Sequence, residues 1–215
     1  HVDFGEPVKL SEAPLPDDQI AISKIAFQVA VEANRVTPAT FPAVVSASLL
    51  GAFPRALTEA EVIREVRDIT RWATKRGVRL SPDFNLNYTD KMPELLGNMI
   101  DEGIIARFDG GLETVYGIAE GQASIASFYR NTIVHFFLHR AVAELALLAL
   151  SERTSEESAM DRFWEEVREL RDLFKFEFFY PETREFEEQI DRELSREAPG
   201  WQERLKDDTD NARIL

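Results

Sequence analysis

The chain has 215 residues, 44% of them hydrophobic and 30% charged, which is the composition of a folded globular protein and excludes a disordered or low-complexity chain. It contains 25 Lys and Arg against 39 Asp and Glu, so its formal net charge is −14. Such a charge disfavours non-specific binding to nucleic acid or to anionic lipid. Cysteine is absent, which excludes a disulfide framework and any metal site with thiolate ligands.

The N-terminal residues predict a strand followed by a linker. Residues 1–10 are strand-like until Gly5 and Pro7, and a chain that begins within a strand is expected to be a piece of a longer protein. Residues 11–18 hold two prolines and three acidic residues, which is typical of a linker.

Two apolar segments follow, and both predict helices. Over 20–34 the apolar residues fall on one stripe with helical spacing. The segment 37–50 is small and apolar and predicts a buried helix, with Thr37 and Pro38 at its start.

The middle of the chain predicts the element order of a winged helix. Thr58 and Glu61 have the spacing of a capping box, which indicates the start of a helix that Gly77 ends. A second helix is predicted over 90–102 and is followed by two strand-like runs, 104–108 and 114–118. Between these runs lies Asp-Gly-Gly, whose glycines are expected to supply the positive φ of a hairpin turn.

A winged helix often binds DNA through its second helix, and here that helix is acidic. It contains four acidic residues against one lysine: Asp90, Lys91, Glu94, Asn98, Asp101 and Glu102. Carboxylates facing phosphates repel them, so DNA binding is disfavoured and a structural module is expected.

The longest helix is predicted over 122–150, a length of roughly 40 Å. Its apolar part contains His135, His139, Arg140 and Glu144, which is too many polar groups for a membrane span. It is therefore expected to be a central helix that is buried on most sides. Further helices are predicted over 155–174 and 183–197, before a polar tail.

Two spacings in the long helix suggest chemistry that the geometry does not support. Asn131, His135 and His139 share one face, but a zinc site needs three or four ligands, and Phe136 stands where metalloproteases have Glu. No metal site is therefore predicted. His139 and Glu144 lie five positions apart, about 140° around a helix, so this carboxylate is not expected to hold that imidazole.

A cluster of polar and aromatic residues in the same helix is the strongest candidate for a site. Tyr129, Arg130, Asn131 and His135 need hydrogen-bond partners if they are buried, because an unpaired buried polar group costs roughly 1–3 kcal/mol. Such residues either line a site or fix one domain against another, and we expect the structural or domain-interface role. A buried Arg130 is expected to have a carboxylate partner.

Four stretches, in this order, resemble segments of the large bacterial glycerol-3-phosphate acyltransferases. Residues 2–8 (Val-Asp-Phe-Gly-Glu-Pro-Val) resemble the strand that closes the catalytic fold of that family, and 37–58 resemble the segment after it. Residues 128–137 (Phe-Tyr-Arg-Asn-Thr-Ile-Val-His-Phe-Phe) resemble the family's Tyr-Arg-Asn-x-x-x-His segment, and 174–181 resemble its Lys-Phe-Glu-Phe run. Together these stretches cover most of the chain.

The resemblance implies the C-terminal helical domain of an enzyme that transfers an acyl group from acyl-CoA or acyl carrier protein to the sn-1 hydroxyl of glycerol 3-phosphate. The product would be lysophosphatidate, in phospholipid synthesis. The family's His-x4-Asp dyad precedes the strand at residues 2–8, so no catalytic residue is expected in this chain, and the fragment alone is expected to be inactive. The implied partner is the chain's own upstream acyltransferase domain, with peripheral association at the cytoplasmic face of the bacterial cell membrane.

The expected fold is mainly α: a multi-helix bundle with one β-hairpin in a winged-helix-like segment, and a short N-terminal strand left over from an α/β acyltransferase domain. The expected domains are 1–18 (end of the acyltransferase domain and linker), 19–200 (C-terminal helical domain) and 201–215 (flexible tail). No cofactor, metal or nucleic acid partner is expected. Two alternatives stay open, a winged-helix-like regulator and a stand-alone helical interaction module.

Overall fold

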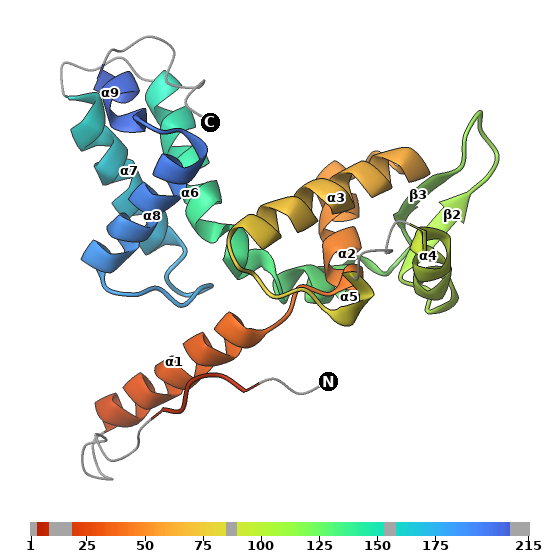
Figure 1. The fold of residues 1–215 in the computed structure, drawn as a ribbon, viewed down its shortest axis with the longest axis horizontal. Helices are drawn as coiled ribbons and strands as arrows, with labels where there is room; N and C mark the ends of the chain where they lie inside the picture. Colours follow the sequence, from red (N-terminus) through yellow and green to blue (C-terminus); the bar gives the residue numbers. More distant parts are fainter. Residues whose placement is uncertain (1–3, 9–18, 85–89, 153–157, 207–215) are drawn as a thin grey trace. The chain divides into compact units, whose positions relative to one another are not determined.

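The computed structural model describes residues 4–8, 19–84, 90–152 and 158–206, and these are mainly helical (Figure 1). The chain divides into two compact units, His1–His135 and Phe136–Leu215. The helical region expected over 19–200 includes residues of both units, and each unit is described by itself below.

The first unit begins with residues 4–8, which form no regular secondary structure. The strand predicted over 1–10 is thus not seen at these positions, and its other residues lie outside the described ones, as do 11–18. Helix α1, Gln19–Val36, contains the apolar stripe predicted over 20–34.

Helix α2, Phe41–Ala52, begins four residues later than the sequence predicts. Its N-cap is Thr40, whose side chain accepts a hydrogen bond from the backbone N–H of Ala43. The hydroxyl of Thr37 instead donates to the carbonyl of Ala33, 2.8 Å away, at the end of α1. The prediction of a buried helix is confirmed, since most of α2 is enclosed where it packs against α3 (Glu59–Lys75) and α5 (Ala123–Asn131).

A winged-helix arrangement follows α2 and confirms the predicted hairpin. Its elements in chain order are β1 (Leu57–Thr58), α3, α4 (Met92–Asp101), β2 (Ile105–Phe108) and β3 (Val115–Ile118). The three strands form one antiparallel sheet in the order β1-β3-β2, in which Tyr116 of β3 lies opposite Leu57. The first strand thus pairs directly with β3 of the hairpin, although α3 and α4 lie between them in the sequence. The sheet therefore links both ends of this segment.

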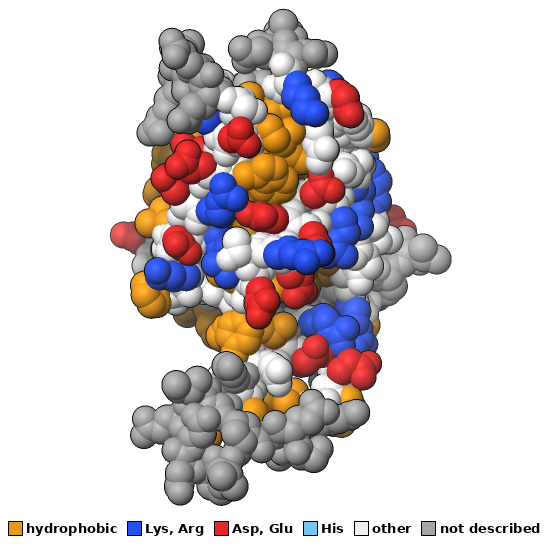
Figure 2. Space-filling model, turned by 90° about the vertical axis from the view of Figure 1, so that its left-hand side faces the viewer, with side chains coloured by type: hydrophobic (Ala, Val, Ile, Leu, Met, Phe, Trp, Pro, Cys, Tyr) orange, Lys and Arg blue, Asp and Glu red, His pale blue; other side chains and the backbone are white. Residues whose placement is uncertain are grey.

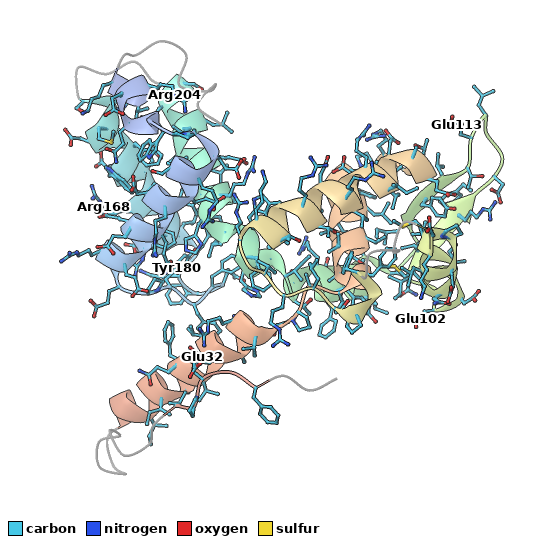
Figure 3. All side chains as sticks on the ribbon, viewed as in Figure 1. Glu32, Glu102, Glu113, Arg168, Tyr180 and Arg204 are labelled. Atoms are coloured by element: carbon cyan, nitrogen blue, oxygen red, sulfur yellow. The ribbon has the colours of Figure 1, made fainter. Side chains whose placement is uncertain are left out.

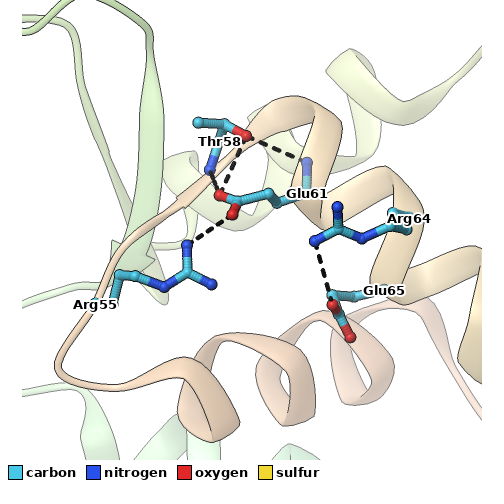
Figure 4. Close-up of polar contacts among 5 residues, drawn as sticks. All are labelled: Arg55, Thr58, Glu61, Arg64 and Glu65. Atoms are coloured by element: carbon cyan, nitrogen blue, oxygen red, sulfur yellow. Dashed lines mark hydrogen bonds and ion pairs between the residues drawn. The ribbon is translucent and has the colours of Figure 1, made fainter.

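The capping box predicted at the start of α3 is present in full (Figure 4). The Glu61 carboxylate accepts from the Thr58 backbone N–H at 2.8 Å, and the Thr58 hydroxyl accepts from the Glu61 N–H at 3.3 Å. Arg55 donates to the same carboxylate at 2.7 Å. The bond from the Thr58 backbone, followed by that from Arg55, lowers the pKa of Glu61. As predicted, α3 ends just before Gly77, which has a φ of 70°.

The hairpin turn is closed by side chains, and the expectation about its glycines is wrong. Neither Gly110 nor Gly111 has a positive φ. Instead, one carboxylate oxygen of Asp109 accepts from Arg107 Nε at 2.9 Å and from the Thr114 hydroxyl at 2.8 Å. Because these bonds hold the two strand ends together, the loop between them does not need a tight glycine turn.

The second unit contains most of α6 (Val134–Glu152), with α7 (Ala159–Leu173), α8 (Thr183–Glu197) and α9 (Trp201–Lys206). The predicted bounds of α8 are confirmed, and the residues between α6 and Ser158 lie outside the described ones. The core is formed by one apolar face of each helix, including Val142, Ala146, Phe163, Val167, Phe186, Ile190, Leu194, Trp201 and Leu205.

The C-terminal tail starts later than predicted. Residues 201–206 were expected to be flexible, but they form α9, in which Trp201 is 1% exposed and Leu205 is fully buried. The reason is the spacing of these two apolar side chains, which puts both on the face that meets α7. Residues 207–215 lie outside the described part of the chain.

Helix α6 is less enclosed than the sequence predicts. Within the described residues it is the one helix whose length and composition would allow it to cross a membrane, over Val134–Ser151. Only 33% of that stretch is buried, so the expectation of a helix buried on most sides is wrong. One face contributes Val142 and Ala146 to the core, while Leu145 and Leu148 on the other side are exposed.

Candidate functional site

The candidate residues Tyr129, Arg130, Asn131 and His135 lie where the predicted long helix is broken. Helix α5 ends at Asn131 and α6 begins at Val134, so the single helix expected over 122–150 is two helices. Thr132 and Ile133 donate their N–H groups to carbonyls three residues back, at 3.1 and 3.0 Å. The Thr132 hydroxyl also donates to the Tyr129 carbonyl at 2.7 Å, which occupies the acceptor that a continuing α-helix would use.

Within the described residues, Arg130 does not form the buried ion pair that was expected. Its Nε and Nη2 donate to the side-chain oxygen of Asn131 at 3.2 and 2.9 Å. Arg130 is half-buried and Asn131 is exposed. A guanidinium that is partly solvated needs no carboxylate, because water supplies the remaining acceptors. Arg130 and Asn131 therefore form a polar pair on the surface of the last turn of α5.

Tyr129 is half-buried beside an exposed aromatic ring. Its ring packs edge-on against Phe128, with the centroids 5.9 Å apart, and Phe128 is 68% exposed. The Tyr129 carbonyl is the acceptor for Thr132, so this residue also marks the end of α5.

His135 makes the contact that joins distant parts of the chain. Its Nε2 lies 3.0 Å from the backbone carbonyl of Asn34 in the last turn of α1, 101 residues earlier. A carbonyl only accepts, so Nε2 bears the proton and the imidazole is the donor. His135 therefore ties the start of α6 to the end of α1 within the first unit. Within the described part of the chain, it is the one of the four candidates that has a hydrogen bond to a residue far away in the sequence.

Burial of the imidazole lowers the pKa of His135, and its bond to the Asn34 carbonyl opposes this effect. The neutral ring is thus the stable form near pH 7, and it needs only one acceptor for the proton on Nε2. The geometry suits an anchor between helices.

The two histidines that share one face of the predicted long helix belong to different units. His139 lies in the second unit, where its Nε2 is 2.6 Å from the side-chain oxygen of Gln189. Glu144 pairs with Arg140 at 2.7 Å, in agreement with the prediction that it does not hold His139. No group of three His, Asp or Glu side chains among the described residues is arranged to hold a metal ion.

The exposed surface of α4 and its flanks is acidic. All six residues singled out in the sequence are exposed: Asp90, Lys91, Glu94, Asn98, Asp101 and Glu102. Glu102 marks the C-terminal end of this surface in Figure 3. In the winged-helix arrangement this helix would face a DNA groove, and its carboxylates would repel the phosphates. The topology of a winged helix is present, while the surface chemistry of a DNA reader is not.

Tyr180 and Arg171 are partners that the sequence analysis missed. Tyr180 ends the aromatic run at 174–181, is 9% exposed and has a hydroxyl without a hydrogen-bond partner within the described residues (Figure 3). The Arg171 guanidinium lies over its ring, 5.6 Å from the centroid, and donates to the Pro181 carbonyl at 2.8 Å. Burial raises the pKa of Tyr180 to about 12, so the phenol stays protonated. The aromatic run followed by Pro was the only sequence signal for this contact.

The sequence of the chain matches a family model over residues 1–214. That model describes the C-terminal region of glycerol-3-phosphate acyltransferase.

Curated relatives include three mycobacterial proteins named "Putative acyltransferase plsB1". They come from Mycobacterium bovis and from the CDC 1551 and H37Rv strains of Mycobacterium tuberculosis, and each is 37% identical to this chain over 201 residues. The match covers 90% of this chain but 32% of each relative. The chain thus spans about a third of the length of the curated relatives that it matches.

Proposed function

The chain belongs to the family of glycerol-3-phosphate acyltransferase C-terminal regions, and from this premise we propose that it is the C-terminal helical part of such an enzyme. The whole enzyme would transfer an acyl group from acyl-CoA or acyl carrier protein to the sn-1 hydroxyl of glycerol 3-phosphate. The product would be lysophosphatidate. The observation on which the proposal rests is the match over 1–214, which leaves almost no part of the chain outside the family.

The proposed roles of the upstream domain and of this chain follow from the positions of the family's sequence motifs. The family's His-x4-Asp dyad would lie upstream, with His as the general base on the acceptor hydroxyl. Residues 1–18 would be the end of that upstream acyltransferase domain and its linker, and the upstream domain would be the main partner of this chain. Since the relatives are about three times as long, there is room for such a domain in proteins of this kind.

We further propose that Tyr129, Arg130, Asn131 and His135 form a structural junction. His135 fixes the end of α1 against the start of α6, and the hydroxyl of Thr132 bonds to the Tyr129 carbonyl where α5 ends. In the whole enzyme this junction would hold α1, the first helix after the linker, in a defined orientation. The role is positioning, because these residues bond to backbone and amide oxygens within the first unit.

The proposed location is the cytoplasmic face of the bacterial cell membrane, with peripheral association. Support comes from the family's place in lipid synthesis and from α6, whose buried face belongs to the core of the second unit. A helix that contributes Val142, Ala146 and Leu150 to a protein core is not available as a lipid-facing span on that side.

The test of the proposed function compares the isolated chain with the full-length enzyme. Each is incubated with acyl-CoA and glycerol 3-phosphate, and the formation of lysophosphatidate is measured. We expect turnover by the full-length protein and none by residues 1–215, because the general base lies upstream. Turnover by the isolated chain would overturn the placement of the active site, and a folded but inactive full-length protein would overturn the assignment of the reaction.

A further inference from the structure

Helix α1 exposes the apolar stripe that an amphipathic helix normally buries. The stripe consists of Ile22, Ile25, Ala26, Val29 and Ala33, which lie within an arc of about 100° around the helix axis. Four of the five are exposed, with Ile22 at 55% and Val29 at 50%, and Ile25 is half-buried. Within the described residues this stripe thus has little cover, although its spacing is that of a core-facing surface.

The last turn of α1 is tied to the start of α6, where the carbonyl of Asn34 accepts a hydrogen bond from His135. Asn34 lies roughly 100° around the helix from Ala33, so the residue that makes this contact is not part of the stripe.

Residues 4–8 lie along the edge of this stripe and complete a groove. The backbone N–H of Glu6 donates to the Glu32 carboxylate at 3.2 Å, which fixes the segment to α1. The approach at Gly5 is close, since a Cβ there would come within 3.3 Å of the Glu32 carbonyl. The groove has a volume of about 720 Å³, and its apolar lining comes mainly from Phe4, Val8, Val29, Ala33 and Val36.

We propose that the α1 stripe and the groove beside residues 4–8 form the docking surface for the enzyme's own upstream region. This inference rests on the proposed function and locates the contact between its two parts. The matched relatives are about three times as long as the matched segment, and the family model is that of a C-terminal region, so the additional length precedes residues 4–8. An upstream domain would therefore enter the fold directly beside this groove.

The charge around the stripe favours a protein occupant over a lipid surface. The stripe itself contains no charged residue, and at its edge Glu32 and Arg35 neutralise each other in an ion pair of 2.8 Å. A net charge of −14 over the chain opposes attraction to anionic lipid. An uncharged apolar strip about three helical turns long fits the surface of another folded domain.

Two cysteine variants of the full-length enzyme test the docking. Val29→Cys places a thiol on the stripe, and Gln28→Cys places one on the neighbouring exposed position, about 100° away around the helix. The native chain has no cysteine, so the introduced thiol is identified by mass spectrometry of the peptide that contains α1. Maleimide labelling rates are measured under native conditions, for each variant in residues 1–215 alone and in the full-length enzyme.

We expect both thiols to react at comparable rates in the isolated chain. In the full-length enzyme, Val29→Cys should react slower by about tenfold or more, while Gln28→Cys keeps its rate, because docking excludes the reagent from one face. Equal rates in the full-length enzyme would overturn the proposal. So would protection of Val29→Cys that requires added liposomes, or protection in the isolated chain that rises with protein concentration, which would indicate a second copy.

The labelling result and the acyltransferase result can fail separately. An active full-length enzyme in which Val29→Cys is freely labelled would leave the function standing and remove the docking surface. A protected Val29→Cys in a protein that forms no lysophosphatidate would keep the docking surface and remove the assigned reaction.

Discussion

His135 and His139 are one helical turn apart but stabilise different units, and both do so as neutral rings. His135 donates to the Asn34 carbonyl in the first unit, and His139 bonds to the Gln189 amide oxygen in the second. Burial is the largest effect on each, and it lowers the pKa of both imidazoles below the usual value of 6.5. Protonation is therefore opposed by the burial of each ring, while the hydrogen bond from Nε2 favours the protonated form.

The sign of the pH dependence follows from these lowered pKa values. The unfolded chain binds protons near pH 6.5, while the folded chain binds them only at lower pH. The contribution of each histidine to the free energy of unfolding is thus fully present above pH 6.5. It is lost as the pH drops towards the pKa of the folded state. Between pH 7.5 and 5.5 we expect each histidine to contribute a loss of at most about 1.4 kcal/mol in the free energy of unfolding.

Denaturant unfolding at the two pH values checks this prediction. His135→Gln and His139→Gln should each remove part of the pH-dependent loss, and the double variant should remove most of it, because glutamine does not titrate. A pH dependence that is the same in the double variant and in the native chain would show that other groups cause it.

At the scale of single elements, the start of α3 is determined by a few local hydrogen bonds. Thr58→Ala removes the hydroxyl that accepts from Glu61 N–H and should lower the free energy of unfolding by about 1 kcal/mol. The matched control is Thr74→Ala in the same helix, where the hydroxyl donates to the Thr70 carbonyl and no cap is lost. There we expect no loss or a slight gain, since alanine favours the helix interior.

Denaturant titrations of the two variants beside the native chain measure both effects. Equal destabilisation by the two substitutions would mean that the capping hydroxyl has no special role. A loss at Thr58 alone would assign the energy to the cap in Figure 4.

Elements with local signals were predictable from the sequence, and those set by competing or distant contacts were not. The capping box, the strands β2 and β3 and the bounds of α8 all follow from neighbouring residues. The break between α5 and α6 does not, because the apolar pattern continues through Thr132 while its hydroxyl takes the Tyr129 carbonyl. Helix α9 was missed because two apolar residues in a short polar segment give a weak pattern.

The candidate site shows the same division. The sequence singled out His135 as a group that needs a partner, and the structure supplies one. The sequence contains no sign that the partner is the backbone carbonyl of Asn34, since every residue has a carbonyl and His135 and Asn34 are 101 positions apart. The expected carboxylate for Arg130 was wrong because the end of α5 leaves its guanidinium half-exposed beside Asn131.

On the scale of the whole molecule, basic residues of the acidic C-terminal part form solvated ion pairs with some of its carboxylates. From residue 151 onward there are 11 basic and 20 acidic residues, and several pair along or between helices, as Arg168 does with Glu187 at 3.1 Å and Arg184 with Glu188 at 3.1 Å. Figure 2 shows basic and acidic side chains interspersed on one face, with apolar ones between them. Exposed pairs of this kind contribute at most about 1 kcal/mol each, so the second unit depends on its apolar core.

That dependence makes α9 decisive for the second unit. The centroid of the Trp201 ring lies 5.1 Å from that of Phe163 and 6.0 Å from that of Trp164. The indole N–H of Trp201 donates to the Asp191 carboxylate at 3.2 Å. Removing a buried tryptophan costs about 3–5 kcal/mol and removing a buried leucine such as Leu205 about 2–5 kcal/mol. The sum is comparable to the total stability of a small folded unit, about 5–15 kcal/mol.

Two truncations separate the helix from the residues that follow it. A chain that ends at Lys206 keeps α9 and should melt within about 1 °C of the native chain. A chain that ends at Gly200 loses the Trp201 and Leu205 contacts, and its second unit should melt at least about 10 °C lower or be unfolded at 25 °C. Thermal unfolding followed by circular dichroism measures both chains. If the chain ending at Gly200 melted like the one ending at Lys206, α9 would add nothing to the core, and the tail would begin at residue 201 as the sequence predicted.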